Sequence, residues 1–248
     1  MRVVISTFFF FLLFPFAAVS DIRLTVVTES SPPYHFLDST GNVTGSVTKK
    51  VKTLLDLAGV KADIQIYPWA RAYKMVLDSS HTLIFSMAVT PERKNNFHWI
   101  AEVAEFELAV VGKKDQNVEN LPTIESVFQG KTFAVQRDDI AYHWLINKGL
   151  REGKELLVCA DIQCSWNYLL RDVVDYIIED PALISHTAKI MNADPDLIEV
   201  VAPIPELSVT GYLAGNEALD SAVVTRLKSA AQQLGMAVTF DDGLAVQR

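Results

Sequence analysis

The stretch that decides the fold is Thr82-Leu-Ile-Phe-Ser-Met-Ala-Val89, followed directly by Thr90-Pro-Glu-Arg93. Its first part is short, apolar and partly β-branched, which is typical of a buried strand. Thr90 and Pro91 then predict a helix start, with a capping hydroxyl and a proline at the first helical position. A cation in a first turn opposes the helix dipole. Arg93 therefore indicates an anion site, where N–H groups, a hydroxyl and a guanidinium would meet a carboxylate. The alternative is a surface arginine beside Glu92.

Strands and helices alternate on both sides of this stretch. The segments before it predict strands at 22–28 and 62–67 and helices over 45–58 and 69–77. Those after it predict strands at 103–111, 131–136, 155–159, 174–178 and 207–214, and helices over 138–148, 162–170, 181–191 and 216–234. Alternation at this pitch is typical of βαβ units, so we expect an α/β fold with a mostly parallel sheet.

The alternation is interrupted twice, near residues 112 and 204. A polar segment follows Gly112-Lys-Lys-Asp115, and Pro203-Ile-Pro205 breaks the later pattern. We therefore expect one lobe formed by 21–112 plus 205–248, and a second lobe, 113–204, inserted into it. Two crossings between lobes make a hinge that can close around a ligand. Because ligands of open α/β sheets bind beyond the carboxyl ends of the strands, both lobes are expected to contribute loops to one cleft.

The first 20 residues have the features of a secretory signal peptide. Arg2 precedes an almost wholly apolar run from Val3 to Ala18, and Ala18-Val-Ser20 offers small residues for cleavage before Asp21. We expect the segment to be removed and the mature protein to be periplasmic. The alternative is a retained membrane anchor. It is disfavoured because the run is short for a membrane span and contains Pro15.

The composition excludes several classes of function. The chain has 22 basic and 30 acidic residues; removal of Arg2 with the signal leaves 21 and 30, a net charge of −9. An acidic exported protein is unsuited to nucleic acid, so no such partner is expected. Cys159 and Cys164 predict one disulfide bond in an exported protein, the alternative being two free thiols. The histidines are scattered without ligand spacing, and we expect no metal or cofactor.

Five segments, taken in order, carry a resemblance to a known family. They are Pro32-Pro-Tyr34 with Gly41 and Gly45, Tyr67-Pro-Trp-Ala-Arg71, Thr90-Pro-Glu-Arg93, Gly130-Lys-Thr-Phe-Ala-Val-Gln136, and Asp175-Tyr-Ile-Ile-Glu-Asp180. Together they resemble the bacterial extracellular solute-binding proteins of family 3, the polar amino-acid-binding proteins of ABC importers. The resemblance covers almost all of the mature chain. It implies a two-lobed periplasmic binding protein fold of type II, in which each lobe is a mostly parallel sheet flanked by helices.

The resemblance also implies roles for individual residues. Tyr34 is similar to the aromatic residue that packs on the ligand, and Ser86 and the backbone of Ala88 match the polar strand end beside it. Thr90 and Arg93 match the pair that grips an α-carboxylate, and Asp180 matches the carboxylate of the second lobe that binds the α-amino group. The remaining candidates for ligand contact are Trp69, Arg71, Gln136 and Arg137.

Some assignments stay open, and some positions depart from the family pattern. Asp180 precedes Pro181, so it is also a candidate helix N-cap, and its neighbour Glu179 is an equal candidate for the cleft. Gly45 is followed by the basic start Ser-Val-Thr-Lys-Lys50. Ala88 replaces a usual serine, and Arg137-Asp138 replaces the usual Gly-Ser or Gly-Thr of the second lobe. The part of the site that the second lobe supplies for gripping the ligand therefore differs from that of the family.

The function that these features predict is binding rather than catalysis. We expect a monomeric periplasmic protein that captures a small carboxylated solute, with an amino acid as the expected ligand, and delivers it to an ABC permease. One alternative is a dehydratase on the same fold, acting on a cyclic acid with Glu179 or Asp180 as general acid. Another is a sensing module that presents the same ligand to a receptor.

Overall fold

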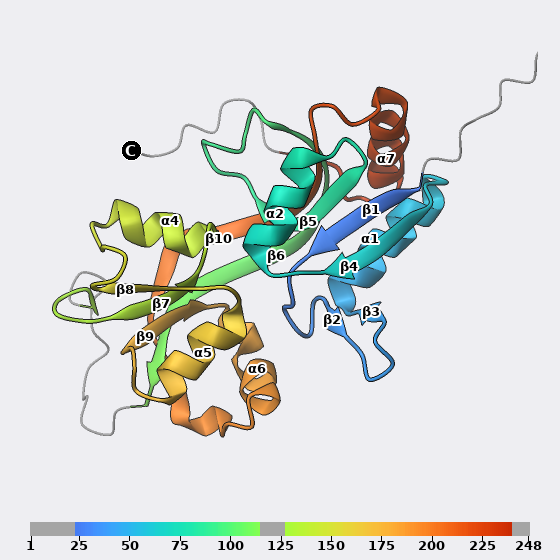
Figure 1. The fold of residues 1–248 in the computed structure, drawn as a ribbon. Helices are drawn as coiled ribbons and strands as arrows, with labels where there is room; N and C mark the ends of the chain where they lie inside the picture. The colour runs from blue at the N-terminus through green and yellow to red at the C-terminus, as the bar shows by residue number, and fades with distance from the viewer. Residues whose placement is uncertain (1–22, 115–126, 240–248) are drawn as a thin grey trace, which may run out of the picture.

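The structure is a computed structural model that describes residues 23–114 and 127–239. The predicted signal peptide and its cleavage position before Asp21 lie outside the described residues. Within them, no helix has both the length and the apolar character needed to cross a membrane. Figure 1 shows two lobes joined by a pair of long strands, with the chain passing from the first lobe to the second and back.

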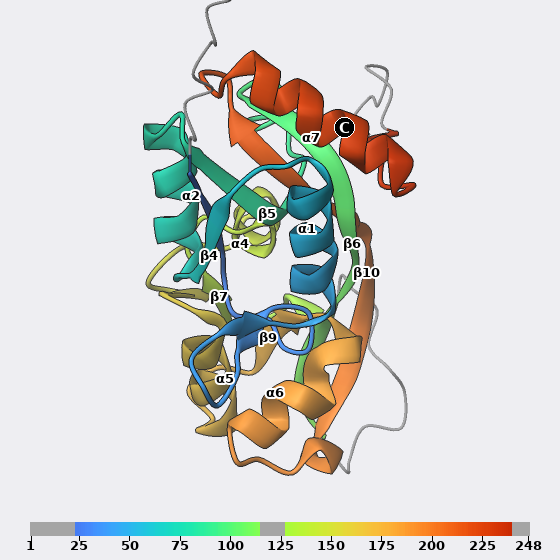
Figure 2. The same cartoon turned by 90° about the vertical axis from the view of Figure 1, so that its right-hand side faces the viewer.

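The first lobe is a sheet covered by helices on both faces. Its elements are β1 (Leu24–Thr28), β2 (Phe36–Leu37), β3 (Val43–Thr44), α1 (Ser46–Leu57), β4 (Ala62–Ile66), α2 (Trp69–Asp78), β5 (Thr82–Ala88) and α7 (Ser221–Gln233). Helices α1 and α7 pack on one face and α2 on the other, as Figure 2 shows. The apolar side chains of α1 recur at helical spacing, which buries Val47, Val51 and Leu54 against β1 and β5.

The second lobe repeats this architecture. Its elements are β7 (Phe133–Gln136), α4 (Ile140–Asn147), β8 (Leu156–Cys159), α5 (Ile162–Leu170), β9 (Tyr176–Glu179), the 3₁₀ turn η1 (Pro181–Leu183), α6 (Ile184–Ile190) and η2 (Pro195–Leu197). Helix α4 packs on one face of the sheet, and α5 and α6 pack on the other. Each lobe therefore has its own apolar core on both sides of its strands.

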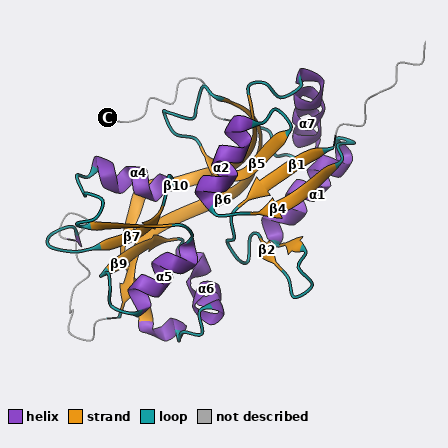
Figure 3. Ribbon diagram, in the orientation of Figure 1, coloured by secondary structure: helices purple, strands orange, loops and turns teal. Residues whose placement is uncertain are grey.

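Strands β6 (Phe97–Lys113) and β10 (Ile198–Asn216) run through both lobes and join them. They pair antiparallel with each other and link all the strands of both lobes except β2 and β3 into one sheet, of order β4-β1-β5-β10-β6-β9-β7-β8. Figure 3 shows this continuous path. Among the described residues, four of the seven pairings in this sheet are parallel. The prediction of a mostly parallel α/β fold is confirmed.

Two local predictions were wrong. No helix follows Thr90: residues 91–95 form turns, in which the N–H groups of Arg93 and Lys94 donate to the carbonyl of Thr90 at 3.0 and 2.8 Å. The turn cannot propagate because Phe97 already pairs with Asn216 at the start of β6. The predicted interruption at 203–205 lies inside β10, where the register with β6 shifts between Pro203 and Ser208. Such an irregularity accommodates prolines within a sheet.

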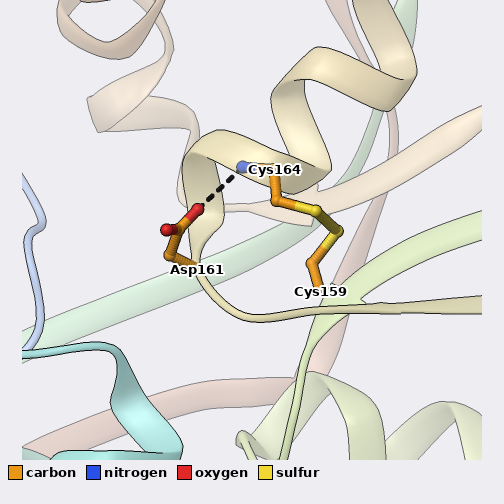
Figure 4. The surroundings of a disulfide bond; sticks show 3 residues. All are labelled: Cys159, Asp161 and Cys164. Atoms are coloured by element: carbon orange, nitrogen blue, oxygen red, sulfur yellow. Dashed lines mark hydrogen bonds between the residues drawn. A yellow bond between two sulfur atoms is a disulfide. The ribbon is translucent and has the colours of Figure 1, made fainter.

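The predicted disulfide bond is present between Cys159 and Cys164 (Figure 4). It joins the last residue of β8 to the first turn of α5, with the two Cα atoms 5.6 Å apart. Between them, the side chain of Asp161 caps the helix by accepting a hydrogen bond from the N–H of Cys164 at 2.8 Å. The disulfide bond therefore fixes the direction in which α5 leaves the sheet.

Candidate ligand-binding site

The carboxyl ends of strands from both lobes surround one cavity of about 110 Å³. Glu29 follows β1, Ser86 lies near the end of β5, Gln136 ends β7 and Glu179 ends β9. All four line the cavity. Open α/β sheets bind their ligands at this edge, because the connecting loops there diverge and leave a crevice.

A backbone irregularity brings Ser86 to the cavity. Ser86 has a φ of 62°, a left-handed conformation that is uncommon outside glycine. The register between β5 and β10 shifts at the same place, between Tyr212 and Ala214, so Ser86 belongs to a β-bulge. Gly211 of β10 allows this close approach, because a Cβ there would lie 3.1 Å from the Cα of Ser86 and 2.7 Å from the ring of Phe106.

Four carboxyl side chains line the cavity: Glu29, Asp139, Glu179 and Asp180. Burial raises the pKa of Glu29 to about 8, with the neighbouring charge of Asp139 as the next cause. Burial likewise raises the pKa of Asp139 to about 7 and that of Glu179 to about 7. Of the described residues that line the cavity, none is a lysine, arginine or histidine. The walls are therefore rich in acceptors and lack a cation.

The two adjacent acids, Glu179 and Asp180, both line the cavity and are both fixed by protein donors. Glu179 accepts hydrogen bonds from the indole N–H of Trp166 and from the N–H of Asp180, each at 3.0 Å. Asp180 accepts from the N–H of Ala182 at 2.9 Å, which makes it the N-cap of η1, and from the hydroxyl of Tyr34. Asp180 thus combines the capping role and the cleft position that the sequence left as alternatives.

Arg93 is buried beside the cavity, with 3 % of its surface exposed, and is not among the residues that line it. Its Nη2 donates to the carbonyl oxygen of Asp138 at 2.8 Å and its Nη1 donates to that of Ala88 at 3.4 Å. The guanidinium carbon lies 5.3 Å from the ring centre of Trp69 and 4.9 Å from that of Tyr73. Burial lowers the pKa of Arg93. Two of its five donors are therefore bonded to backbone carbonyl oxygens.

The N-terminus of α4 is capped by the protein itself. The side chain of Asp139 accepts a hydrogen bond from the N–H of Tyr142 at 2.6 Å and a second from the N–H of Ala141. Asp138, just before it, has a φ of 58°, which directs its carbonyl oxygen toward the first lobe. That oxygen accepts hydrogen bonds from Arg93 and, at 2.9 Å, from the indole N–H of Trp69.

Five of the ten predicted site residues line the cavity: Trp69, Ser86, Ala88, Gln136 and Asp180. Tyr34 borders it through its bond to Asp180 and packs against Phe106, with ring centres 5.6 Å apart. Arg93 lies behind it, as described above. The roles of these residues in ligand binding remain predictions.

The other three predicted residues are not among those that line the cavity. Arg71 is exposed and stacks on Tyr67, 4.2 Å from the ring centre. Arg137 is exposed, with its Nη1 3.8 Å from a carboxylate oxygen of Glu152. The hydroxyl of Thr90 hydrogen-bonds to Glu92.

The sequence reasoning missed several cavity residues, above all Glu29 and Asp139. A signal for both was available, because each follows the carboxyl end of a predicted strand within three residues. The apolar wall, which includes Phe106 and Leu183, had no comparable signal. Within residues 23–114 and 127–239, no group of three or more His, Cys, Asp or Glu side chains is arranged to hold a metal ion.

Comparisons with known proteins agree with this architecture. The sequence model of the bacterial extracellular solute-binding proteins, family 3, matches residues 24–169, more than half of the chain. The two-lobed fold is that of the type II periplasmic binding proteins, and the chain belongs to the family 3 extracellular solute-binding proteins. A search of curated proteins finds no match.

Several solved structures share the fold at low sequence identity. A histidine kinase sensor domain similar to periplasmic binding proteins has a TM-score of 0.72 and 16 % identity, over 86 % of this chain and 90 % of that one. The arginine-bound form of a truncated ArgBP from T. maritima has a TM-score of 0.70 and 19 % identity, over 86 % and 96 %. The arginine-, lysine-, histidine-binding protein ArtJ from Geobacillus stearothermophilus has a TM-score of 0.69 and 16 % identity, over 86 % of this chain and 89 % of that one.

Proposed function

We propose that this protein is a periplasmic solute-binding protein that captures a small solute by cleft closure and delivers it to an ABC importer of the inner membrane. The observation that carries the proposal is a cavity between two lobes whose walls are connected by hydrogen bonds across the cleft. Trp69 and Arg93 of the first lobe donate to the carbonyl of Asp138 on one side of the cavity. Tyr34 bonds to Asp180 on another.

These bonds give a physical reason for coupling between ligand and closure. Each of them exists only when the lobes approach, and the cavity wall is complete only in the same state. A solute held by both walls would therefore stabilise the closed form relative to the open one, which is how ligands shift a hinge equilibrium.

An amino acid is the ligand that the family suggests, and two similar structures are named for arginine binding. The specific prediction is an α-carboxylate at Arg93 and an α-amino group at Asp180. It requires Arg93 to exchange the carbonyl of Asp138 for the ligand. The carboxyl groups of the cavity walls favour binding of the ligand's α-amino group.

The remaining parts of the proposal concern location and organisation. We propose that the signal peptide is cleaved before Asp21, that the mature protein is a monomer, and that the lobes divide near residues 112 and 204. Both positions lie inside the strands that connect the lobes, β6 and β10. These strands would then form the hinge.

A solution experiment tests closure and binding together. Mature protein purified from the periplasm is screened by thermal shift against amino acids, amines and small organic acids. Any stabilising compound is then examined by small-angle X-ray scattering, where binding should decrease the radius of gyration. Mass spectrometry should recover the compound intact after long incubation. Absence of any stabilising small molecule, or binding with no decrease in radius, contradicts the proposal.

A sensing role is the second candidate, because a histidine kinase sensor domain is among the similar structures. The binding chemistry would be the same, and the recipient would be a receptor rather than a permease. Uptake of the labelled ligand by cells lacking this protein separates the two roles. Loss of uptake supports transport, whereas unchanged uptake with a lost transcriptional response supports sensing. Consumption of the compound, abolished by Glu179→Gln, would instead indicate an enzyme.

A further inference from the structure

We propose that the ligand of this cavity is an organic cation without a carboxylate, carrying an amine or guanidine on a short hydrocarbon chain. The inference rests on the proposed binding function and specifies its ligand class. It departs from the amino acid that the family suggests. Four properties of the cavity support it.

The first property is the charge of the walls. Glu29, Asp139, Glu179 and Asp180 contribute carboxyl groups, and no basic side chain belongs to the described lining. A carboxylate entering this space would be repelled by every wall carboxyl group that is ionised, and burial in a medium of low dielectric constant makes that repulsion strong. A cation would instead favour the ionised form of these groups and would be attracted to them.

The second property is that both groups expected to bind a carboxylate already donate to protein acceptors. The N–H groups of Ala141 and Tyr142, at the start of α4, donate to the side chain of Asp139. The guanidinium of Arg93 donates to the carbonyls of Ala88 and Asp138. A ligand carboxylate at this place would have to displace the protein's own acceptors and then lie beside Asp139.

The third property is a set of buried acceptors that have no protein partner. Oε2 of Glu29, Oε1 of Gln136 and Oγ of Ser86 are inaccessible to solvent and have no hydrogen-bond partner in the described part of the chain. Gln136 has only 7 % of its surface exposed, and its amide group hydrogen-bonds to the carboxyl of Glu29.

Buried polar atoms without partners are costly, and they are uncommon in folded proteins. Gln136 Oε1 and an ionised Glu29 accept hydrogen bonds, and the Ser86 hydroxyl can accept one as well as donate one. The three groups come from β7, the residue after β1, and β5. An ammonium group offers three donors and a guanidinium up to five, with no acceptor of its own. Either group can therefore donate to the buried atoms that lack partners, and does so better than a neutral ligand that carries acceptors of its own.

The fourth property is an apolar wall beside these acceptors. Its side chains are Phe106, Leu108, Ile162, Ile178, Leu183 and Val209. Methylene groups stabilise a complex by leaving water for such a surface, at roughly 0.8 kcal/mol for each buried CH₂. The cavity therefore combines carboxyl groups with a hydrocarbon lining, and this matches a cation on a short alkyl chain.

Matched pairs of compounds test whether the preferred ligand lacks a carboxylate. Titration calorimetry compares arginine with agmatine and ornithine with 1,4-diaminobutane, each pair differing only in the α-carboxylate. We expect the decarboxylated member of a pair to bind at least tenfold more tightly. Equal or tighter binding of the amino acid overturns this inference while leaving the proposed binding function intact. Binding of Ca²⁺ or Mg²⁺ in place of either amine also overturns it. Failure of all compounds in the broader screen contradicts the proposed function itself.

A pair of variants tests the location. Glu29→Gln removes the buried carboxylate, and Asp172→Asn removes one exposed charge from a salt bridge with Lys113 on the second lobe. Asparagine suits the position of Asp172, whose φ is 57°. We expect Glu29→Gln to weaken agmatine binding at least tenfold and Asp172→Asn to leave it within twofold. Unchanged affinity in a folded Glu29→Gln protein, verified by its thermal transition, overturns the assignment of Glu29.

Discussion

The guanidinium of Arg93 donates a hydrogen bond to the carbonyl oxygen of Asp138 across the cleft, at 2.8 Å. The same oxygen accepts the indole N–H of Trp69 at 2.9 Å. One peptide carbonyl at the start of the second lobe is thus held by two side chains of the first. Because Arg93 lies behind the cavity rather than in its lining, its position favours a role in closure.

Substitutions at these two donors should weaken ligand binding through closure. Trp69→Phe keeps an aromatic ring but removes one donor, and we expect about fivefold weaker binding, since a hydrogen bond contributes about 1 kcal/mol. Arg93→Ala should weaken binding by roughly 30-fold or more, because a buried charged partner contributes about 2–5 kcal/mol. Calorimetry measures both effects, and scattering should show a larger radius for the ligand-free variants.

Arg71→Ala is the matched control for Arg93→Ala. Arg71 is exposed, stacks on Tyr67 and is not among the residues that line the cavity. Its removal should change affinity by less than twofold. Equal effects of the two arginine substitutions would contradict the closure role of Arg93.

The sequence predicted the local elements well because these depend on local patterns. The spacing of Val47, Val51 and Leu54 defines a buried helix face whatever the sheet behind it does. The turn after Thr90 was misread for the opposite reason. Its capping residues suit a helix, but the pairing of Phe97 with Asn216, 119 positions away, requires an extended chain.

The site was predicted only in part because its contacts join distant segments. Arg93 is conspicuous in the sequence, but its partner is a backbone carbonyl 45 positions away, and backbone carbonyls leave no trace in a sequence. Ser86, a predicted ligand contact, lines the cavity, but the bulge that turns it inward depends on Gly211 of another strand, which the sequence around Ser86 does not reveal. Arg137 stands where the chain departs from the family pattern, and its exposed side chain approaches Glu152.

Gly45 should tolerate no side chain. It has a φ of 120°, and a Cβ there would collide with the carbonyl of Tyr34, which accepts the N–H groups of Val47 and Thr48 at the start of α1. We expect Gly45→Ala to cost more than about 3 kcal/mol in unfolding free energy, because it combines strain with a clash. Gly59→Ala is the control, with a φ of 61° and open space around it, and should cost only about 1–2 kcal/mol. Denaturant unfolding measures both; similar costs would show that the clash is relieved.

Loss of the disulfide bond should destabilise the second lobe moderately. Cys159 and Cys164 close a loop with a sequence separation of 5. The loop-entropy relation gives about 2 kcal/mol for such a short loop. We expect the Cys159→Ser, Cys164→Ser double variant to lose about this much in urea unfolding and to remain folded. Mass spectrometry of unreduced wild-type peptides should show the link, and two free thiols in periplasmic protein would refute it.

The buried carboxyl groups predict an unusual dependence of stability on pH. Burial, followed by the charges of Asp139, Glu179 and Asp161, raises the pKa of Glu29 to about 8. The folded protein therefore keeps a proton that the unfolded chain has already lost, and its stability falls as pH rises through the folded pKa. Burial lowers the pKa of His35 to about 4, so the contribution of His35 to stability increases as pH rises from about 4 to 6.5. Above pH 6.5 this contribution no longer changes with pH.

The window from pH 6.5 to 8 therefore isolates the carboxyl groups. Over these 1.5 pH units Glu29 alone should reduce the unfolding free energy of ligand-free protein by up to about 2 kcal/mol, at 1.36 kcal/mol for each unit. Glu29→Gln should have a flatter profile, since glutamine does not titrate. A bound cation should flatten the wild-type profile as well, because it favours the ionised carboxylate, and affinity for the cation should rise with pH over the same window. Urea unfolding at several pH values, with and without agmatine, measures each effect. Parallel profiles for wild type and Glu29→Gln would show that Glu29 is ionised throughout the window and would remove it as the source of the pH dependence.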